Sequence, residues 1–245
     1  MRDELKIKNM REGGKVIVEI LRRIVGEVRP GITTLFLDQT AESLCEKWKV
    51  KPAFKGYSDY PATLCIGPED IVVHGIPDGR VLREGEIVSL DFGIIYQGYY
   101  LDMARTVPVG SIRPEIQDFL DTTALALKNA CEVATVGHTI GDIGYAICTT
   151  VEAKGYSVVR EMVGHTIGRH LHEDPMIPGY GNPGEGEPLY DGQTIAIEAI
   201  INQGRPGITI SKQDGWTSRT KDGKLSALFE NTVLVSDESE ILTPL

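Results

Sequence analysis

Two aspartates lie inside a segment whose pattern predicts a buried β-hairpin. The segment EGEIVSLDFGIIYQGYYLDMART carries Asp91 in its first arm and Asp102 in its second. If Gln97-Gly98 forms a two-residue turn, side-chain alternation puts both aspartates on one face, with backbones roughly 7–8 Å apart; a turn with an odd number of residues breaks this parity. A buried ionised carboxylate is costly unless a cation neutralises it. The pair could therefore hold two divalent ions, typically about 3.5–4 Å apart.

Two further acids occur in similarly apolar surroundings. Glu198 lies in TIAIEAII, and Glu230 lies in LSALFENTVLV, where it shares its strand face with Leu228. Any one of these four acids alone is better explained as an edge-strand charge or a salt-bridge partner. Four acids embedded in apolar strands favour a common cation site instead.

Histidines cluster in one short stretch, VGHTIGRHLHEDP, which contains His165, His170 and His172. Its glycines and proline disfavour a helix, and an extended chain puts His165 on the opposite face from the other two unless a bulge intervenes. His74 ends an apolar run before a turn, and His138 is interpreted as structural. Each histidine taken alone is more often structural than functional.

An oxygen-rich ligand set with one imidazole suits Mn²⁺, Fe²⁺ or Co²⁺ better than a structural Zn²⁺. Such ions produce a hydroxide nucleophile near neutral pH and polarise a carbonyl group. Histidines that bind no metal could stabilise the developing oxyanion or move protons. The residues by themselves thus indicate a dinuclear metallohydrolase that acts on an amide or an ester.

The elements that must position these residues follow one order twice. The expected order is a helix at 17–28, a helix at 34–48 capped by Thr33 or Thr34, strands over 54–109, a helix at 116–130, a helix from a capping box at Thr139 and Asp142 to Val151, and strands from Ser157, with a long loop near 178–188.

Two short segments repeat at nearly the same offset. PGITT at Pro30 resembles VGHTI at Val136, 106 residues later, and EGEIVSLD, ending at Asp91, resembles DGQTIAIE, ending at Glu198, 107 residues later. We therefore expect an α+β fold of two pseudosymmetric helix–helix–strands halves around a central antiparallel sheet. The halves would span about 10–110 and 111–240 of a single domain, residues 1–245.

Composition excludes several classes of protein. A net charge of −10 argues against DNA binding and against attachment to an anionic membrane surface. The first residues, MRDELKIKNMREGG, are too polar for a signal peptide, and no apolar run approaches the roughly 18 residues of a membrane span. The four cysteines form no C-x-x-C pair, which argues against a disulfide framework or zinc knuckle and fits a reducing cytoplasm.

Seven motifs along almost the whole chain together resemble type I methionine aminopeptidases: MREGGK, HGIP, LDFG, YLDMART, GHTIGRHLHEDP, IAIEAI and LFENTVLV. The resemblance implies the curved, pseudosymmetric pita-bread fold. It also implies five metal ligands, of which Asp102 and Glu230 bridge two ions, Asp91 binds one, and His165 and Glu198 bind the other. Glu198 would also handle the proton of the attacking water. His74 and His172 would contact the substrate and the tetrahedral intermediate.

By the same resemblance, the chain would remove the initiator methionine from nascent proteins whose second residue is small, using hydroxide held at the dinuclear site. The ions would be Co, Mn or Fe, with Zn or Ni as alternatives. A monomeric cytoplasmic enzyme that contacts the ribosome transiently is expected. The methionine pocket would comprise Tyr57, Tyr60, Cys65, Leu171 and Trp216, with Phe54 at its rim. Aromatic walls and a soft thiol suit a thioether, although such residues mostly build cores.

Three positions depart from the family pattern: Thr166 replaces a usual glycine, Ala199 a common proline, and Leu171 a phenylalanine found in some members. None is a ligand, so they bear on pocket shape and rate. The 25 residues between His172 and Glu198 leave no room for a type II insertion, and the polar start lacks the zinc-binding extension of eukaryotic type I enzymes. A bacterial-type enzyme is expected. The alternatives are an Xaa-Pro aminopeptidase, a binding-only relative and a purely structural protein.

Overall fold

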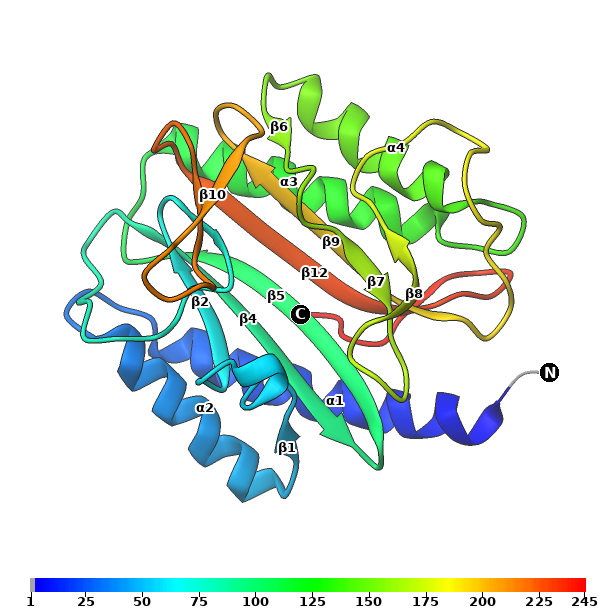
Figure 1. The fold of residues 1–245 in the computed structure, drawn as a ribbon, viewed down its shortest axis with the longest axis horizontal. Helices are drawn as coiled ribbons and strands as arrows, with labels where there is room; N and C mark the ends of the chain where they lie inside the picture. Colours follow the sequence, from blue (N-terminus) through cyan, green and yellow to red (C-terminus); the bar gives the residue numbers. More distant parts are fainter. Residues whose placement is uncertain (1–2) are drawn as a thin grey trace.

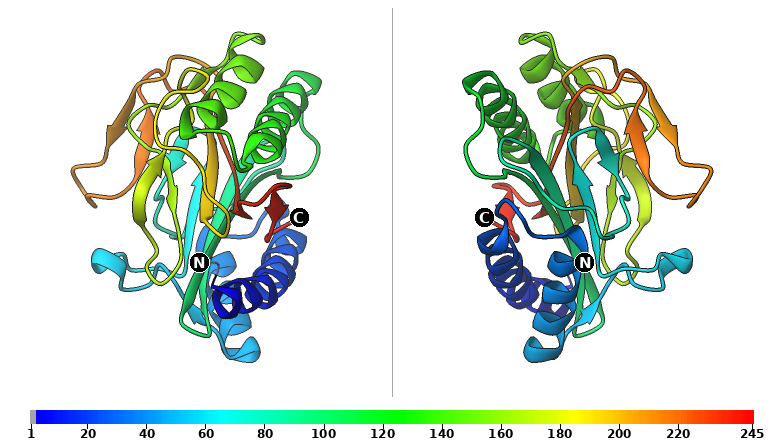
Figure 2. Two further views of the ribbon diagram at one scale, coloured as in Figure 1. Left: turned by 90° about the vertical axis from the view of Figure 1, so that its right-hand side faces the viewer. Right: turned by 90° about the vertical axis from the view of Figure 1, so that its left-hand side faces the viewer.

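The computed structural model describes residues 3–245 and contains four α-helices and a short 3₁₀ helix (Figure 1). α1 and α3 pack against one face of a large sheet, whereas η1 and the β10–β11 hairpin lie on its other side (Figure 2). The helices are α1 (Glu4–Glu27), α2 (Thr34–Trp48), η1 (Tyr57–Asp59), α3 (Pro114–Val133) and α4 (Ile140–Glu152).

The main sheet is antiparallel in all its pairs and follows the path β1-β4-β5-β12-β9-β7-β8, with β2, β6 and β13 attached beside it. A small sheet has the order β10-β11-β3. The strands are β1 (Lys51–Pro52), β2 (Leu64–Pro68), β3 (Ile71–Val73), β4 (Ile87–Tyr96), β5 (Tyr99–Pro108), β6 (Ser157–Val158), β7 (Gly164–Thr166), β8 (Glu173–Ile177), β9 (Thr194–Asn202), β10 (Ile208–Ile210), β11 (Ser218–Thr220), β12 (Ser226–Leu234) and β13 (Glu240–Ile241).

The helix signals in the sequence are confirmed, except at the start of α1. Thr33 caps α2 through the N–H of Phe36, and the capping box at Thr139 opens α4. α1 begins at Glu4, well before the predicted range, because Gly13-Gly14 does not interrupt it. These glycines let the helix approach the side chain of Leu101 and the backbone of Leu242, where a Cβ would collide.

The two halves repeat the order of helix, helix and strands, as the sequence predicted. α1 packs across β4 and β5, and α3 packs in the same way across β9 and β12. Each pair buries its own apolar core against the helix side of the sheet. The assignment of residues 1–245 to a single catalytic domain stays a prediction, and residues 1 and 2 of that range lie outside the described part.

The central hairpin has the predicted register. Gln97 and Gly98 form its turn with positive φ angles of 50° and 80°, Tyr96 pairs with Tyr99, and Gly93 faces Asp102. Asp91 and Asp102 therefore project from the same face of the sheet, opposite the helices.

No helix within residues 3–245 combines the length and the apolar composition that crossing a membrane requires.

Candidate active site

Four strands place three of the acids in one row across the sheet. Asp91 on β4 pairs with Ala104 on β5, Ala104 pairs with Glu230 on β12, and Glu230 pairs with Glu198 on β9. Paired residues of antiparallel strands point to the same side of the sheet. The register alone therefore brings Asp91, Glu230 and Glu198 to one face, with a small alanine between the first two.

A second row, two residues along, contributes Asp102 and His165. Asp102 lies beside Thr232, whose hydroxyl accepts the N–H of Asp102 at 3.0 Å and donates to its carbonyl oxygen at 2.8 Å. Thr232 pairs with Ala196, and Ala196 pairs with His165 on β7. Small side chains thus lie between ligand-type ones, Ala104 in the first row and Thr232 and Ala196 in the second, which leaves space beside the carboxylates.

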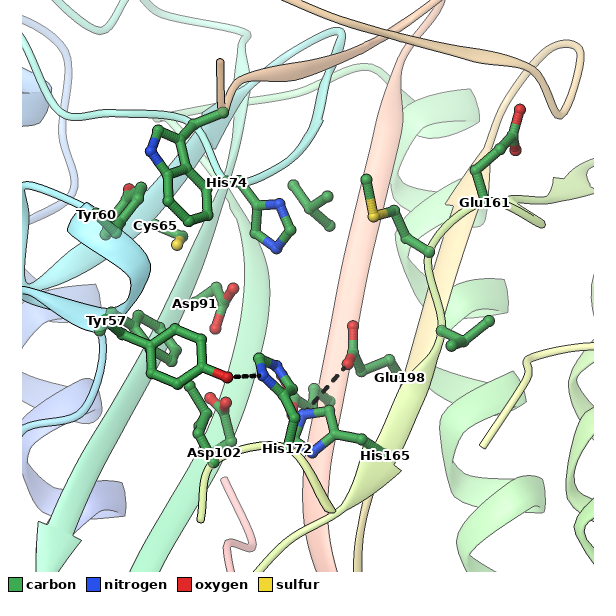
Figure 3. Close-up of a pocket in the computed structure, with 17 residues that line it drawn as sticks. Tyr57, Tyr60, Cys65, His74, Asp91, Asp102, Glu161, His165, His172 and Glu198 are labelled. Carbon is green, nitrogen blue, oxygen red and sulfur yellow. Dashed lines mark hydrogen bonds and ion pairs between the residues drawn. The ribbon is translucent and has the colours of Figure 1, made fainter. Parts of the chain in front are cut away.

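The acids converge on the face of the sheet opposite the helices. One side-chain atom each from Asp102, His165 and Glu230 lies within 4.8 Å of the others, and these three side chains are almost completely buried. One carboxylate oxygen each of Asp91, Asp102 and Glu230 is buried and accepts no hydrogen bond from the described residues. Figure 3 shows Asp91, Asp102 and Glu198 reaching into the same space. The alternative of solvated edge-strand charges is therefore wrong.

Among the described residues, no lysine or arginine forms an ion pair with this cluster, although the charge of nearby Arg105 slightly opposes the rise in the pKa of Glu230. Arg105 lies close by, but its guanidinium donates to the carbonyl oxygens of Ala104 and Glu230 and to Asn231. Burial raises the pKa of Asp91 to about 7. Burial, reinforced by neighbouring carboxylates, holds the pKa values of Asp102, Glu198 and Glu230 well above their usual range.

These properties fit divalent cations. Hard or borderline divalent ions prefer carboxylate oxygens and imidazole, and their charge removes the penalty of burying several like-charged carboxylates. The oxygens without hydrogen-bond partners are the atoms that such ions would contact.

His165 is positioned to present a free ring nitrogen to the acids. Its Nδ1 lies 3.1 Å from the carbonyl oxygen of Thr166 and, as the donor, leaves Nε2 with a lone pair 3.8 Å from Glu198 Oε1. Burial lowers the pKa of His165 to about 3, so the ring is neutral and the contact with Glu198 is not an ion pair.

His165 and His172 reach the same site because the strand is interrupted, which is the exception that the sequence left open. The β7–β8 pairing shifts register between His165 and Thr166, and residues 167–172 form a loop rather than a strand. This loop returns His172 to the site, where its ring centroid lies 4.4 Å from that of His165. An irregular backbone thus brings both histidines to one site, whereas a regular strand would place them on opposite faces.

His74 enters the cleft from the opposite wall. It has a positive φ of 58°, which few non-glycine residues adopt, and its ring packs edge-on against Trp216 at a centroid distance of 6.0 Å. Burial lowers the pKa of His74 to about 4. A neutral imidazole there can donate a hydrogen bond without adding charge.

All thirteen residues predicted for the site line one cavity of about 270 Å³. Sequence reasoning missed four further lining residues: Val73, Glu161, Met162 and Val163. The missed segment 161–163 lies directly before the GHTIG motif, and Val73 directly before His74, so chain proximity to a predicted site residue was the available signal. The Glu161 carboxylate points away from the acid cluster (Figure 3).

The predicted methionine pocket adjoins the acids. Tyr60 is buried, and its hydroxyl donates to the carbonyl oxygens of Leu64 and Gly75, so that only its ring faces the cavity. Trp216 packs edge-on against Tyr60 at 5.2 Å. Burial raises the pKa of the Cys65 thiol well above its usual range, which keeps the sulfur uncharged. The wall is thus apolar and polarizable.

The side chains of two of the three departures from the family pattern are directed away from the cluster. Thr166 donates to the carbonyl oxygen of Pro175, and Ala199 is buried in the helix-side core. Leu171 is buried and lines the cavity.

We expect Ala104→Val to lower the affinity for divalent metal at least about 10-fold, because added methyl groups would enter the space between Asp91 and Glu230. Overpacking also costs roughly 1–3 kcal/mol of stability. Ala227→Val on β12 is the matched control, since Ala227 is equally buried but belongs to the helix-side core. Metal titration by calorimetry should separate the two variants, and equal affinities would contradict the assignment of this space.

Comparison with known proteins agrees with this geometry. The model of metallopeptidase family M24 matches residues 8–237. Methionine aminopeptidases from Clostridium acetobutylicum and Clostridium perfringens are 41% and 43% identical to the chain, and each alignment covers 99% of the chain and 98% of the relative. The crystal structure of methionine aminopeptidase from Rickettsia prowazekii superimposes with a TM-score of 0.97 at 36% identity, covering 100% of this chain and 99% of that one.

The fold predicted from the sequence is therefore confirmed, because the superposition extends over the whole chain. The family and the buried cluster together indicate that the chain uses divalent metal. The chain belongs to metallopeptidase family M24, in its group of bacterial methionine aminopeptidases.

Proposed function

We propose that the chain removes the N-terminal methionine from newly made proteins whose second residue is small. One observation carries this proposal: a cluster of buried carboxylates without cationic partners lies beside an apolar, sulfur-containing pocket in one cavity. The cluster supplies the metal site and the pocket accepts the methionine side chain. The names of the aligned relatives support the same activity.

We assign five metal ligands: Asp91, Asp102, His165, Glu198 and Glu230. Two divalent ions held by these residues would best offset the four carboxylates. Once bound, the ions would polarise the scissile carbonyl and lower the pKa of water. Co, Mn and Fe are favoured, with Zn and Ni as alternatives.

Three residues of the chain handle the peptide and its protons. Glu198 is partly accessible, with 15% of its side chain exposed, and its raised pKa suits it to take a proton from the attacking water and deliver it to the leaving nitrogen. His74 and His172 lie on opposite sides of the cleft (Figure 3). Their ring N–H groups are suited to hold the peptide carbonyl as negative charge develops on it.

We also propose that the enzyme is a cytoplasmic monomer that contacts the ribosome transiently. All four cysteines are free and buried, which fits a reducing cytoplasm. The expected monomer and the transient ribosome contact follow from the family resemblance and from the nature of the substrate, a nascent N-terminus.

Metal-loaded protein should release methionine from Met-Ala-Ser much faster than from a peptide with a bulky second residue, and faster than it cleaves Ala-Pro peptides. Samples stripped of metal and reloaded with Co, Mn, Fe, Zn or Ni would be assayed by free methionine. Faster cleavage of Ala-Pro peptides would identify an Xaa-Pro aminopeptidase. Metal binding without any cleavage would identify a binding protein.

A further inference from the structure

A hydrogen bond crosses the mouth of the cleft. The Tyr57 hydroxyl oxygen lies 2.7 Å from Nδ1 of His172, and the two rings meet edge-on at a centroid distance of 5.2 Å (Figure 3). Tyr57 precedes β2 in the first half of the chain, whereas His172 lies in the β7–β8 loop of the second half. The contact therefore joins the two sides of the substrate cavity.

Tyr57 is held by an unusual backbone. Gly56, Ser58 and Asp59 have positive φ angles of 85°, 46° and 68°, and two of these residues are not glycine. Such angles persist only where the surrounding structure enforces them, and they concentrate at functional sites. Here Tyr60 anchors the turn, because its buried hydroxyl is bonded to two backbone carbonyls. The turn is thus fixed at one end and presents Tyr57 over the cleft.

The His172 ring depends on this contact. The base of its loop is tethered to the central hairpin, through the N–H of Tyr100 to the carbonyl of Gly168 and through Arg169 to the Tyr99 hydroxyl. His172 is an exposed residue, and within residues 3–245 the Tyr57 hydroxyl is the hydrogen-bond partner that the structure gives its ring. The hydrogen bond to Tyr57 therefore orients the His172 ring.

We propose that Tyr57 is a positioning residue for catalysis as well as a pocket wall: its hydroxyl donates to Nδ1 of His172 and fixes the tautomer that carries hydrogen on Nε2. That tautomer leaves Nε2–H free to donate to the peptide carbonyl. The inference rests on the proposed function. The positioning role requires the Tyr57 hydroxyl. A residue that only lined the pocket would need just its ring, because a methionine side chain makes no use of the hydroxyl.

Tyr57→Phe separates the two roles because it keeps the ring and removes only the oxygen. We expect kcat for Met-Ala-Ser to fall roughly 3- to 10-fold, as for the loss of one hydrogen bond, with KM within about 2-fold of wild type. In a His172→Ala background the same change should have no further effect, because the hydroxyl acts through that ring. Tyr190→Phe, which removes an exposed hydroxyl elsewhere, is the matched control. Unchanged kcat in Tyr57→Phe, or additive losses in the double variant, would overturn the proposal.

A spectroscopic readout does not depend on activity. In zinc-loaded, ¹⁵N-labelled protein, His172 should show a protonated Nε2 and an unprotonated Nδ1, and Tyr57→Phe should give a mixture of both tautomers. A protonated Nδ1 in the wild type, or an identical spectrum in the variant, would refute the positioning role. If the wild type released no methionine, the proposed function would fail, and this spectrum would still test the bridge.

Discussion

Asp102→Asn is expected to reduce kcat/KM for methionine release by roughly 1000-fold or more and to lower the bound metal content. One carboxylate oxygen of Asp102 lies within 4.8 Å of a ligand atom of His165 and of Glu230. Asparagine keeps the shape of the side chain and one carbonyl oxygen but removes the negative charge. Divalent ions supply several kcal/mol of transition-state stabilisation, and each 1.36 kcal/mol corresponds to about a factor of ten in rate. Peptide kinetics and elemental analysis of the purified variant measure both effects.

Asp38→Asn is the matched control for this substitution. Asp38 is also a buried aspartate whose pKa is raised by burial, but it accepts the N–H groups of Thr63 and Leu64. Its loss should reduce stability and leave metal content and rate near wild type. Asp102→Asn should instead stabilise the metal-free chain, because it removes a group that must take up a proton, or bury a charge beside other carboxylates, when the chain folds. A variant with normal metal content and normal rate would eliminate Asp102 as a ligand.

The local sequence pattern was sufficient to predict the central hairpin and its register. The turn at Gln97 and Gly98 fixes the register over the whole of β4 and β5, so the relation between Asp91 and Asp102 follows from counting along the chain. The acidic residue in each apolar run was visible for the same reason, since a carboxylate among buried residues is conspicuous. The caps of α2 and α4 were equally readable, because their side-chain hydrogen bonds are local.

Pairing between distant strands was not readable in this way. The row from Asp91 to Glu198 depends on β12 lying between β5 and β9, which no local signal states. The place of His172 depends on an irregular loop, and alternation rules predict the wrong face for it. Met162 and Val163 have no chemistry of their own that marks them, and only the fold brings them to the cavity. The family resemblance supplied what the residues alone could not.

Stability of the metal-free chain should fall as pH rises above about 6.5. Burial raises the pKa of Asp91 to about 7 and the pKa values of Asp102, Glu198 and Glu230 well above their usual range, so the folded state holds protons that the unfolded state has already released. The free energy of unfolding then decreases with pH until these groups ionise. Each group that stays protonated from about pH 6.5 to pH 8 removes roughly 2 kcal/mol over that range.

Two histidines set the lower limit of the pH range in which stability should decrease. The pKa values of His74 and His165 are lowered to about 4 and about 3, so their contribution to stability is lost as pH falls below about 6.5, where unfolded histidine takes up a proton. Below that pH, protonation of these histidines in the unfolded state lowers the free energy of unfolding as pH falls, against the effect of the acids. Above it the histidines are neutral in both states and do not contribute to the pH dependence of stability.

Urea unfolding of protein stripped with a chelator and then dialysed, measured at about pH 6.5 and pH 8, tests this dependence. The metal-free chain should be less stable at the higher pH, whereas metal-loaded protein should gain stability, because binding displaces the same protons and strengthens as they leave. Asp102→Asn should flatten the slope of the metal-free chain, since it removes one titrating group and lessens the repulsion on the others. A metal-free wild type whose stability rises over this range would mean that the carboxylates are already ionised in the fold, and that something other than metal neutralises them.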